Sequence, residues 1–414
     1  MSGPFGSNIG KRFFVEEGIP VIRGNNLSLG MGRFNDGGFV FLTEEKAAEF
    51  KNCEAHPNDL LFTAAGTIGQ VGIIPPRPRY SKYIISNKQL RARLDQARIQ
   101  PLFAYYWLAS PPMVAMIQNR NTGSTIPLIN LSVLRSLPIP LPPLEAQDAI
   151  VSVLSALDDR ITLLCETNAT LEAIAQALFK SWFVDFDPVH AKQQGRAPEG
   201  MDEATAALFP DSFEESELGL VPRGWRYVSL KDVVSIFDSK RIPLAGQDRA
   251  KRQGVYPYYG AAALMDSIDD YLFDGVYLLT GEDGSVADPQ GFPITQYVWG
   301  KIWVNNHAHV LQGRDGVSTE QVMLSLKRTN IQSFITGAVQ AKLSQSNMWR
   351  IMFLRPLREI SESFGASIEP LYTRLRHNSE QARTLATLRD TLLPRLISGQ
   401  LRLPEAEAML GVAA

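Results

Sequence analysis

The sequence predicts an α+β protein made of two similar globular regions of mixed α and β structure, each followed by one long helix. Three observations support this fold class. The chain has 414 residues, of which 45% are hydrophobic and 20% are charged. It repeats itself at a fixed spacing, and each copy of the repeat contains a long run of regularly spaced apolar residues. Because this length exceeds one ordinary domain, we expect at least two hydrophobic cores.

The repeat appears when the sequence is shifted against itself by 214 residues. Residues 122–150 then align with residues 336–364 at low identity. The register continues without a gap into the next segment, where Leu154 meets Ile368. Apolar positions do not stay in phase over such a length by chance, so the sequence indicates an internal duplication.

The end of each repeat is predicted to be a long helix. Apolar residues recur at steps of three, four and seven, in a narrow stripe typical of coiled coils. We expect helices over residues 144–186 and 358–400, each of ~40 residues and ~60 Å. Helices of this length are too long for one globular region to cover, which favours their pairing with each other; packing of each helix on its own globular region is the alternative. The side chains expected between the helices are Ile150, Leu154, Leu157, Ile161, Leu171, Leu178, Ile368, Leu371, Leu375, Leu385, Leu388 and Leu392.

The two predicted helices differ in their proline content. The first has no proline between Pro143 and Pro188. The second contains Pro370 and Pro394, which predict a kink at the first position and fraying or a break near the second. Gly399 is expected to end this helix, because glycine favours the left-handed conformation that terminates helices.

The remaining segments complete the predicted domain organisation. Short apolar runs punctuated by Gly, Pro and Asn predict strands and turns in both globular regions. An acidic stretch with several prolines and glycines reads as a linker. The predicted order is a first globular region, a helix, a linker, a second globular region, a helix and a tail, with the bounds 1–143, 144–186, 187–215, 216–357, 358–400 and 401–414.

Charge is distributed unevenly along a chain whose net charge is −2. Residues 1–142 contain 15 Lys and Arg against 9 Asp and Glu, whereas residues 143–215 contain 4 against 14. A basic first quarter is typical of a module that binds a polyanion, although a basic solvated surface has the same composition. The two cysteines, Cys53 and Cys165, are far apart, which fits a reducing cytoplasm, and no apolar run is long enough to span a membrane.

Motifs for chemistry are not apparent. The chain has no Walker A sequence, dinucleotide fingerprint or methyltransferase motif. His307 and His309 would lie on one face of a strand, but a third ligand is missing, so we expect no metal. Asp185 and Asp187 resemble a catalytic carboxylate pair, with His190 nearby. The shift of 214 residues places no acids opposite them, and this stretch is better interpreted as a joint between a helix and a globular region. We therefore expect no catalytic residues in this chain.

The residues that remain fit contact with nucleic acid. Five loops combine basic, amide and aromatic groups, which can meet phosphates or read base edges. Each loop taken alone is better explained as a solvated turn or a packed aromatic group, but together they favour a binding surface. The candidate DNA-contacting residues are Arg23, Asn25, Asn26, Arg77, Arg79, Lys82, Lys240, Arg241, Lys251, Arg252, Tyr258 and Tyr259.

Several segments resemble the specificity subunit of Type I restriction–modification enzymes. These are "GPFGSN" (3–8), "GIPVIRGNNL" (18–27), "LPIPLPPLEAQDAIVSVLSALDDRI" (137–161), "SWFVDFDPV" (181–189), "LGLVPRGW" (218–225) and "LRDTLLPRLISGQL" (388–401). Together they span nearly the whole chain. The resemblance implies that each globular region is a target recognition domain reading one half of a split DNA sequence, and that the helices form an antiparallel coiled coil.

The resemblance also implies the partners. Double-stranded DNA, two modification (methyltransferase) subunits and a restriction/translocase subunit would bind this chain in the cytoplasm, and S-adenosylmethionine, ATP and Mg would be bound by those partner subunits. Two other functions stay open: a duplicated helical adaptor that binds other proteins without DNA specificity, and a self-sufficient nuclease or methyltransferase, which the missing motifs disfavour.

One segment departs from the family pattern. The second globular region opens with "GLVPRGWRYVSLKDVVSIF" (219–237), whereas the first begins at Met1 without an equivalent of ~20 residues. Either this element is absent, or another segment, such as the tail 401–414, supplies it.

Overall fold

The computed structural model describes residues 1–337, 339–402 and 405–406, which fold as two compact units. Unit 1 comprises residues 1–164 and the described residues from Gln381 onward, and unit 2 comprises Cys165–Glu380. Each unit thus contains one globular region together with half of each long helix. The bounds predicted from the sequence separate the long helices from the globular regions, whereas the contacts assign each half-helix to the globular region that it packs against.

Unit 1 contains a four-stranded sheet of order β2-β1-β6-β3 and a three-stranded sheet of order β5-β4-β7. Four short helices accompany them in the globular region. The bounds are β1 Ile19–Ile22, β2 Val40–Leu42, β3 Glu54–Ala55, β4 Leu60–Thr63, β5 Val71–Ile73, β6 Tyr83–Ile85, β7 Gln89–Ala92, α1 Glu44–Ala48, α2 Pro101–Leu108, α3 Pro111–Asn119 and α4 Leu131–Arg135.

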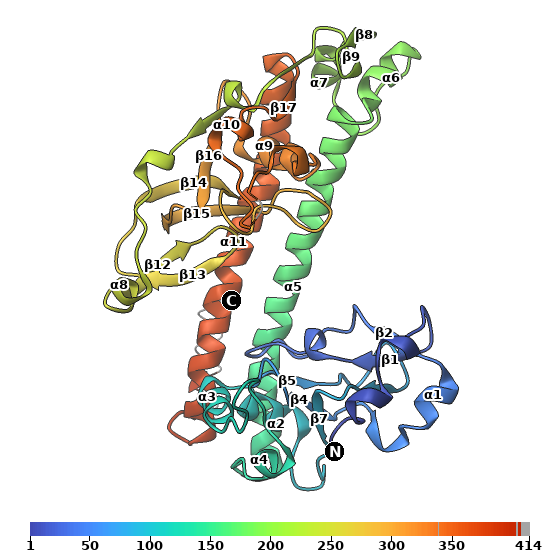
Figure 1. Cartoon of the computed structure of the whole chain (residues 1–414), viewed down its shortest axis with the longest axis vertical. Helices are drawn as coiled ribbons and strands as arrows, with labels where there is room; N and C mark the ends of the chain where they lie inside the picture. Colours follow the sequence, from blue (N-terminus) through green and yellow to red (C-terminus); the bar gives the residue numbers. More distant parts are fainter. Residues whose placement is uncertain (338, 403–404, 407–414) are drawn as a thin grey trace. The chain divides into compact units, whose positions relative to one another are not determined.

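Unit 2 contains a six-stranded sheet of order β11-β16-β14-β15-β12-β13 and the two-stranded sheets β10-β17 and β8-β9 (Figure 1). One core joins apolar side chains of this sheet, of α9 and of the long helices. The bounds are β8 Phe213–Ser216, β9 Gly219–Pro222, β10 Arg226–Ser229, β11 Val234–Ile236, β12 Gln253–Tyr259, β13 Leu264–Ile268, β14 Phe273–Gly281, β15 Thr295–Val304, β16 Ala308–Gly313, β17 Met352–Arg355, α6 Asp187–Gln193, α7 Glu203–Leu208, α8 Gly246–Ala250, α9 Thr319–Leu326 and α10 Gln345–Met348.

Matching backbone hydrogen bonds confirm the internal duplication. The Thr122 N–H donates to the Leu128 oxygen at 2.8 Å, and 214 positions later the Thr336 N–H donates to the Lys342 oxygen at 2.9 Å. The sheets match as well, because β1 pairs in parallel with β6 in unit 1 and β12 pairs in parallel with β15 in unit 2. The two units are therefore built on one hydrogen-bonding scheme, despite their low sequence identity.

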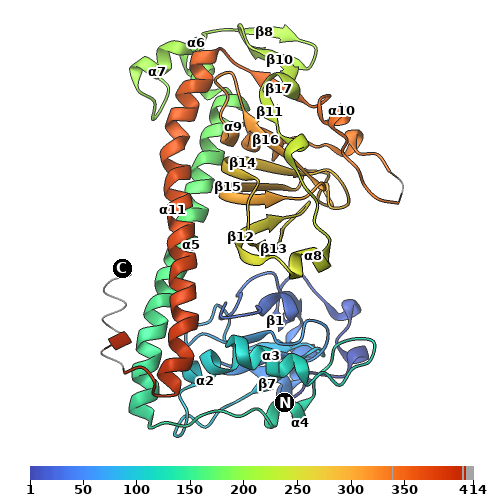
Figure 2. The ribbon, with the colours of Figure 1, turned by 90° about the vertical axis from the view of Figure 1, so that its left-hand side faces the viewer.

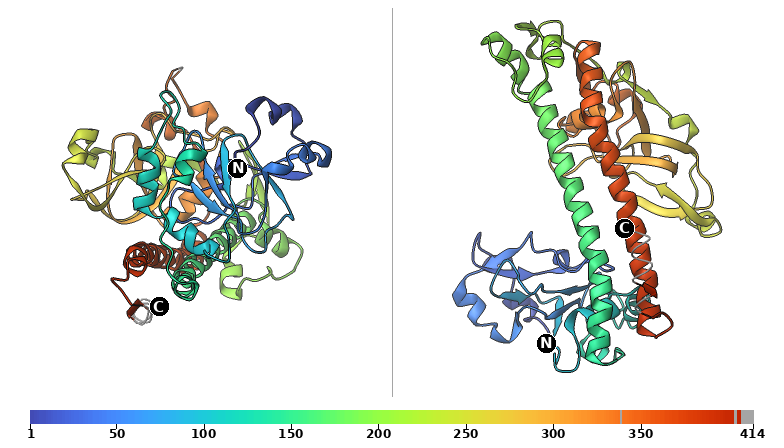
Figure 3. Two further views of the ribbon diagram at one scale, coloured as in Figure 1. Left: turned by 90° about the horizontal axis from the view of Figure 1, so that it is seen from below. Right: turned by 180° about the vertical axis from the view of Figure 1, so that it is seen from behind.

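The two long helices are α5 (Leu144–Phe183) and α11 (Arg358–Ile397), each of 40 residues. Within each unit they run side by side in opposite directions (Figures 2 and 3). In unit 2 a residue late in α5, Phe179, contacts an early residue of α11, Phe364, with ring centroids 5.9 Å apart. The predicted antiparallel helix pair is confirmed. In the described part of the chain, the helices are all too short or too polar to cross a membrane.

All twelve side chains predicted between the helices are buried or pack against a hydrophobic core. Those of residues 150–161 and 385–392 belong to the core of unit 1, and those of residues 171–178 and 368–375 belong to the core of unit 2. Ile174 also follows the apolar spacing, but it is 44% exposed, whereas Ala175 and Phe179 are buried. The apolar stripe therefore shifts towards Ala175 and Phe179 near the end of α5, where large aromatic residues replace leucine.

The expected break near Pro394 is wrong, because α11 continues to Ile397. Its end lies where the glycine was predicted to stop it: Gly399 has φ +72°, and its N–H donates to the Leu396 oxygen at 3.2 Å. A proline three residues before the end of a helix removes one N–H but leaves the following turn intact.

The stretch with Asp185 and Asp187 is a joint, as the sequence analysis favoured. The Trp182 and Phe183 rings lie at the end of α5 against Phe209 and Trp225, with centroids 5.1 Å and 5.7 Å apart. Four large aromatic side chains, all buried, thus anchor the helix end to the core of unit 2.

The polar residues of this joint act separately. Asp185 forms an ion pair with Lys180, and Asp187 is the first residue of α6. Between them Phe186 adopts a left-handed conformation (φ +56°), which turns the chain sharply. The His190 ring stacks on Phe213 at 4.7 Å. The two acids therefore share neither a partner nor a site.

The predicted linker 187–215 is more ordered than its composition suggested. It contains α6 and α7, and the start of β8. Buried Phe209 lies within it and contributes to the core of unit 2. Within the tail, Leu401 and Ala406 are buried in the core of unit 1, while residues 403–404 and 407–414 lie outside the described residues.

Pro370 lies in the interior of α11 on an exposed face. We predict that Pro370→Ala raises the free energy of unfolding by about 1–3 kcal/mol, since an interior proline removes a helical hydrogen bond and costs about 3 kcal/mol, part of which its stiffening of the unfolded chain offsets. Urea denaturation followed by circular dichroism measures this. The exposed Ser367→Ala on the same helix serves as control and is expected to shift stability by no more than about 0.5 kcal/mol. An unchanged or lower stability of the proline variant would contradict the prediction.

Candidate nucleic-acid interface

The first predicted loop of unit 1 is held by a buried asparagine. The Asn26 side chain accepts a hydrogen bond from the Arg23 backbone N–H at 2.9 Å, and donates to the backbone oxygens of Asn35 and Gly37 at 3.0 and 2.8 Å. Because Asn26 is fully buried, it cannot touch DNA, and its prediction as a DNA contact was wrong. Its amide instead fixes the loop to the segment 34–39.

That segment also fixes the second predicted loop of unit 1. The Asp36 carboxylate accepts hydrogen bonds from the Tyr83 hydroxyl and the Arg79 backbone N–H, both at 2.8 Å. The rings of Phe39 and Tyr80 meet edge to face with centroids 5.8 Å apart. The structure thus brings both predicted loops together. We call residues 23–26, 34–39 and 77–82 the unit 1 loop cluster.

Five predicted DNA-contacting side chains remain on the unit 1 loop cluster. The Arg23 guanidinium and the Asn25 amide both donate to one backbone oxygen of the segment 34–39, at 3.2 and 3.1 Å, and Asn25 is exposed. Arg77 and Arg79 are exposed, and Lys82 is half-buried. Neither Arg77 nor Lys82 forms an ion pair with any residue that the structure describes. These cations are therefore available to phosphates.

The unit 1 loop cluster is anchored to both long helices through Arg33, which directly precedes it. The Arg33 guanidinium donates to the Asp158 carboxylate of α5 at 3.3 Å and to the Tyr106 hydroxyl at 3.0 Å. The Arg389 guanidinium of α11 donates to the other oxygen of Asp158 at 2.5 Å. Asp158 is buried, and buried carboxylates require such partners. Arg33 thus ties the start of the segment 34–39 to the helix pair.

In unit 2, a buried tyrosine holds the predicted loops. The Tyr258 hydroxyl accepts a hydrogen bond from the Leu244 N–H at 3.0 Å, and the Arg249 guanidinium donates to the Leu244 oxygen at 2.7 Å. The Trp303 indole N–H donates to the Ile242 oxygen at 2.7 Å. Tyr258 is 1% exposed, so its prediction as a DNA contact was wrong. Residues 256–259, predicted as a loop, lie instead in β12. We call residues 238–252, together with the end of this strand at 256–260, the unit 2 loop cluster.

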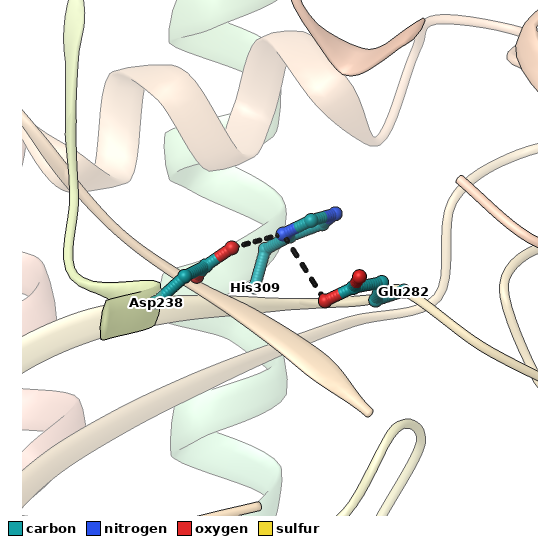
Figure 4. A group of neighbouring side chains, drawn as sticks. All are labelled: Asp238, Glu282 and His309. Atoms are coloured by element: carbon teal, nitrogen blue, oxygen red, sulfur yellow. Dashed lines mark hydrogen bonds and ion pairs between the residues drawn. The ribbon is translucent and has the colours of Figure 1, made fainter. Parts of the chain in front are cut away.

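Asp238, Glu282 and His309 lie together near the start of the unit 2 loop cluster (Figure 4). Arg241 joins this ionic group. Its guanidinium lies 2.8 Å from a Glu282 oxygen and 3.3 Å from an Asp238 oxygen. The His309 Nδ1 lies 2.5 Å from the same Asp238 carboxylate, and its Nε2 lies 2.8 Å from the Leu343 oxygen. Since the Arg241 side chain is 11% exposed, it stabilises the loop rather than contacting DNA, which corrects the prediction.

Both ring nitrogens of His309 face acceptor oxygens, which favours the doubly protonated ring. Burial alone would lower the pKa of His309, but the Asp238 carboxylate, the Leu343 oxygen and the Glu282 carboxylate raise it above its ordinary value of 6.5. The Asp238 and Glu282 carboxylates thus both lie beside Arg241 and His309, and the Lys342 ammonium lies 3.7 Å from the other oxygen of Glu282.

The same group bears on metal binding. The sequence places His307 and His309 on one strand face, whereas the structure brings His309 together with Asp238 and Glu282. The possible ligand atoms of these three residues lie within 4.8 Å of one another. A divalent ion here would have to displace the Arg241 guanidinium from both carboxylates and remove the proton from the His309 Nδ1. The arrangement fits an internal ion cluster better than a metal site.

Four predicted side chains remain at the surface of the unit 2 loop cluster. Lys240 and Lys251 are exposed, and Tyr259 is half-buried. Arg252 lies 2.9 Å from an Asp269 carboxylate oxygen, so part of its charge is already neutralised. The lysines are the freest cations of this cluster.

Sequence reasoning missed the segment 34–39, which joins the loops of unit 1. Its composition, with two aromatic residues around an Asn-Asp-Gly-Gly turn, resembles many ordinary turns. The signal that could have identified it is Asp36, because an acid inside a basic region often holds a neighbouring loop.

Two α/β units of one duplication, each with exposed basic side chains on its loops, are typical of a protein that binds a polyanion. Comparison with known proteins agrees with this class. The Type I restriction modification DNA specificity domain matches twice, over residues 11–173 and 222–373. The chain therefore belongs to the Type I restriction–modification DNA specificity family, and each match falls on one copy of the duplication.

Two curated relatives support the same assignment, and one solved structure is reported beside them. The chain is 26% identical to the Type I restriction enzyme HindI specificity subunit of Haemophilus influenzae over 384 residues, covering 77% of this chain and 81% of that protein. It is 24% identical to the MjaIX specificity subunit of Methanocaldococcus jannaschii over 382 residues, covering 87% and 82%. A solved S subunit from M. genitalium shares 17% identity with a TM-score of 0.47, over 96% of this chain and 99% of that one. The family assignment makes DNA target recognition the role of this chain, and the alternative of an adaptor without DNA specificity is not favoured.

The raised pKa of His309 predicts how stability depends on pH. Stabilisation by the protonated ring is fully present below pH 6.5, the ordinary pKa, and is lost as the pH rises through the higher pKa of the folded state. We predict that His309→Asn costs about 1.5–3 kcal/mol near pH 6, as expected for a hydrogen bond to a charged group, and less towards pH 9. Urea denaturation at several pH values measures the difference. The exposed His307→Asn provides the control, and a cost that grows with pH would contradict the assignment.

Proposed function

We propose that this chain reads a two-part, asymmetric DNA target, with each loop cluster contacting one half of it. The observation that carries the proposal is the repeated backbone scaffold with different loops: Thr122 and Thr336 make equivalent hydrogen bonds, whereas the exposed groups of the two clusters differ. Equivalent scaffolds dock on DNA in the same manner, and different side chains select different bases.

We assign separate roles to the exposed groups. Arg77, Arg79 and Lys82 in unit 1, and Lys240 and Lys251 in unit 2, contact phosphates, because these cations have few protein partners. Asn25 and the remaining amide and aromatic groups at the loop tips contact base edges. Phosphate contacts set affinity and register, while the base contacts set the sequence that is accepted.

The rest of the complex is also part of the proposal. Two modification subunits and a restriction subunit bind this chain in the cytoplasm of the host, and those partners bind S-adenosylmethionine, ATP and Mg. The chain itself is non-catalytic. Support comes from its lack of the relevant sequence motifs and from the ionic group around Asp238, whose carboxylates are neutralised by Arg241.

The phosphate contacts can be tested in a complex reconstituted with modification subunits. We predict that Arg77→Ala/Arg79→Ala weakens DNA binding and lowers the slope of log K against log salt by about 2, because each lost phosphate contact removes about 0.9 from the slope. Fluorescence anisotropy with duplex DNA at several salt concentrations measures both quantities. Arg98→Ala, an exposed cation beside the start of α5, serves as control. Equal slopes for the double variant and the control would refute this assignment.

The two-part reading predicts that a change in one loop cluster alters one half of the target. Asn25→Ala is expected to relax base choice at one or two positions of one half-site, and to leave the other half unchanged. Mapping methylated adenines in DNA modified by the reconstituted complex identifies both halves. Relaxed selectivity in both halves, or methylation without sequence preference in the unmodified chain, would lead us to abandon the proposal.

A further inference from the structure

A pair of asparagines lies in the interface between α5 and α11 in unit 2. The Asn378 amide donates to the Asn168 side-chain oxygen at 2.9 Å. The Asn168 amide in turn donates to the Leu375 backbone oxygen at 3.1 Å and to the Ser379 hydroxyl at 3.0 Å. Asn378 is 1% exposed. One hydrogen bond thus joins the two side chains, and the Asn168 amide makes two further bonds to α11.

These amides occupy an otherwise apolar stripe. Leu171 and Leu375 next to them belong to the core of unit 2. A buried amide lowers the stability of a helix pair unless a polar group on the other helix faces it. An asparagine in such a stripe therefore restricts which helix can pair there, and in which register.

The duplication provides an internal comparison for this position. The shift of 214 residues places Asn168 on Ala382 and Asn378 on Leu164. In unit 1, Leu164 is buried in the core and Ala382 packs against it. The equivalent position in the other half of the helix pair is thus filled by two apolar residues, so the backbone of the pair does not require amides here.

Consider two copies of the chain whose like helices pair in this register. In a pair of two α5 helices, each Asn168 would face the leucine at position 164 of the other copy. In a pair of two α11 helices, each Asn378 would face an alanine at position 382. Every amide in these pairs would lack its partner, and each such loss lowers a pairing constant by roughly 10- to 100-fold. Amide meets amide only when α5 pairs with α11.

We propose that the Asn168–Asn378 pair selects pairing of α5 with α11, and rejects pairing of like helices from two copies of this chain. Pairing of α5 with α11 keeps the two different globular regions of one chain on the same helix pair. Asp158 and Arg389 act in the same direction in unit 1, because the shift places them on Tyr372 and Ala175. The pairing rule does not depend on the proposed function; its consequence for DNA, one asymmetric target in place of a symmetric one, does.

Two variants of the full chain are designed to reverse this preference, so that like helices pair better than α5 with α11. In Leu164→Asn/Asn378→Leu, α5 carries both amides and α11 carries none, so amides meet only when two α5 helices pair. In Asn168→Ala/Ala382→Asn, α11 carries both. A matched control, Leu164→Asn/Ala382→Asn, introduces the same kind of buried amide but keeps an amide opposite every amide when α5 pairs with α11.

The native Cys165 reports the pairing of two α5 helices. It is exposed on α5, whereas the other cysteine, Cys53, is buried. In a pair of two α5 helices, where 164 meets 168, the two copies of Cys165 lie next to the centre of the pair. A short bifunctional maleimide reagent then links them covalently, and Cys165→Ser measures the background of this reaction.

Each variant is unfolded in urea, refolded at micromolar concentration, cross-linked and weighed by light scattering. We expect both reversal variants to contain at least tenfold more dimer than wild type or the matched control. The variant Leu164→Asn/Asn378→Leu, which has both amides on α5, should also give at least tenfold more product cross-linked through Cys165. Reversal variants that remain monomeric, folded or not, would overturn the proposal, as would equal dimer formation by the matched control. If the reversal variants dimerise as expected but their dimers bind DNA without sequence preference, the result would contradict the proposed function and leave the helix-pairing proposal intact.

Discussion

The structure depends on the burial of one apolar stripe on each of two 40-residue helices. The sheets alone do not cover either stripe. Exposure of its apolar side chains to water would be unfavourable. Pairing α5 with α11 removes both stripes from water at once, since the apolar driving force scales with buried area. Every other packing decision follows from this pair: each globular region packs against the half-helices beside it, and each core contains leucines from both helices.

Hydrogen bonds and ion pairs fix the position of each globular region on the helix pair more closely than apolar contacts do. Apolar packing tolerates small shifts, whereas hydrogen bonds to a buried carboxylate accept only a narrow range of geometry. Asp158 receives donors from the loop side through Arg33 and from α11 through Arg389. In unit 2 the same kind of link runs from the Tyr297 hydroxyl of β15 to Glu320 and to Arg376 of α11. The residues differ between the units, but in both of them charged groups fix the globular region to the helix pair.

The sequence predicted the architecture better than the interface, for a physical reason. Helix length, apolar spacing and duplication are properties of many residues at once, and each leaves a periodic signal. DNA contact depends on individual side chains, whose burial is decided by distant segments. Asn26 and Tyr258 are residue types expected at a binding surface. Their polar atoms instead form hydrogen bonds with the Gly37 oxygen and the Leu244 N–H. Arg241 carries the expected charge, but its guanidinium pairs with Asp238, three residues away, and with Glu282, 41 residues away. Propensity contains no information on such partners.

The hydrogen bonds that the two units share include backbone bonds, between Thr122 and Leu128 and between Thr336 and Lys342. The hydroxyls of Thr122 and Thr336 donate to the same two oxygens. Main-chain bonds place few demands on side-chain identity, so mutation of the loop tips leaves this framework intact. After the ancestral duplication, each copy was therefore free to acquire new loop residues without loss of folding. A change in the loops of one unit would alter one half of the DNA target and leave the other half unchanged. Because the two units vary independently, the number of possible targets is the product of the half-sites that each unit can recognise.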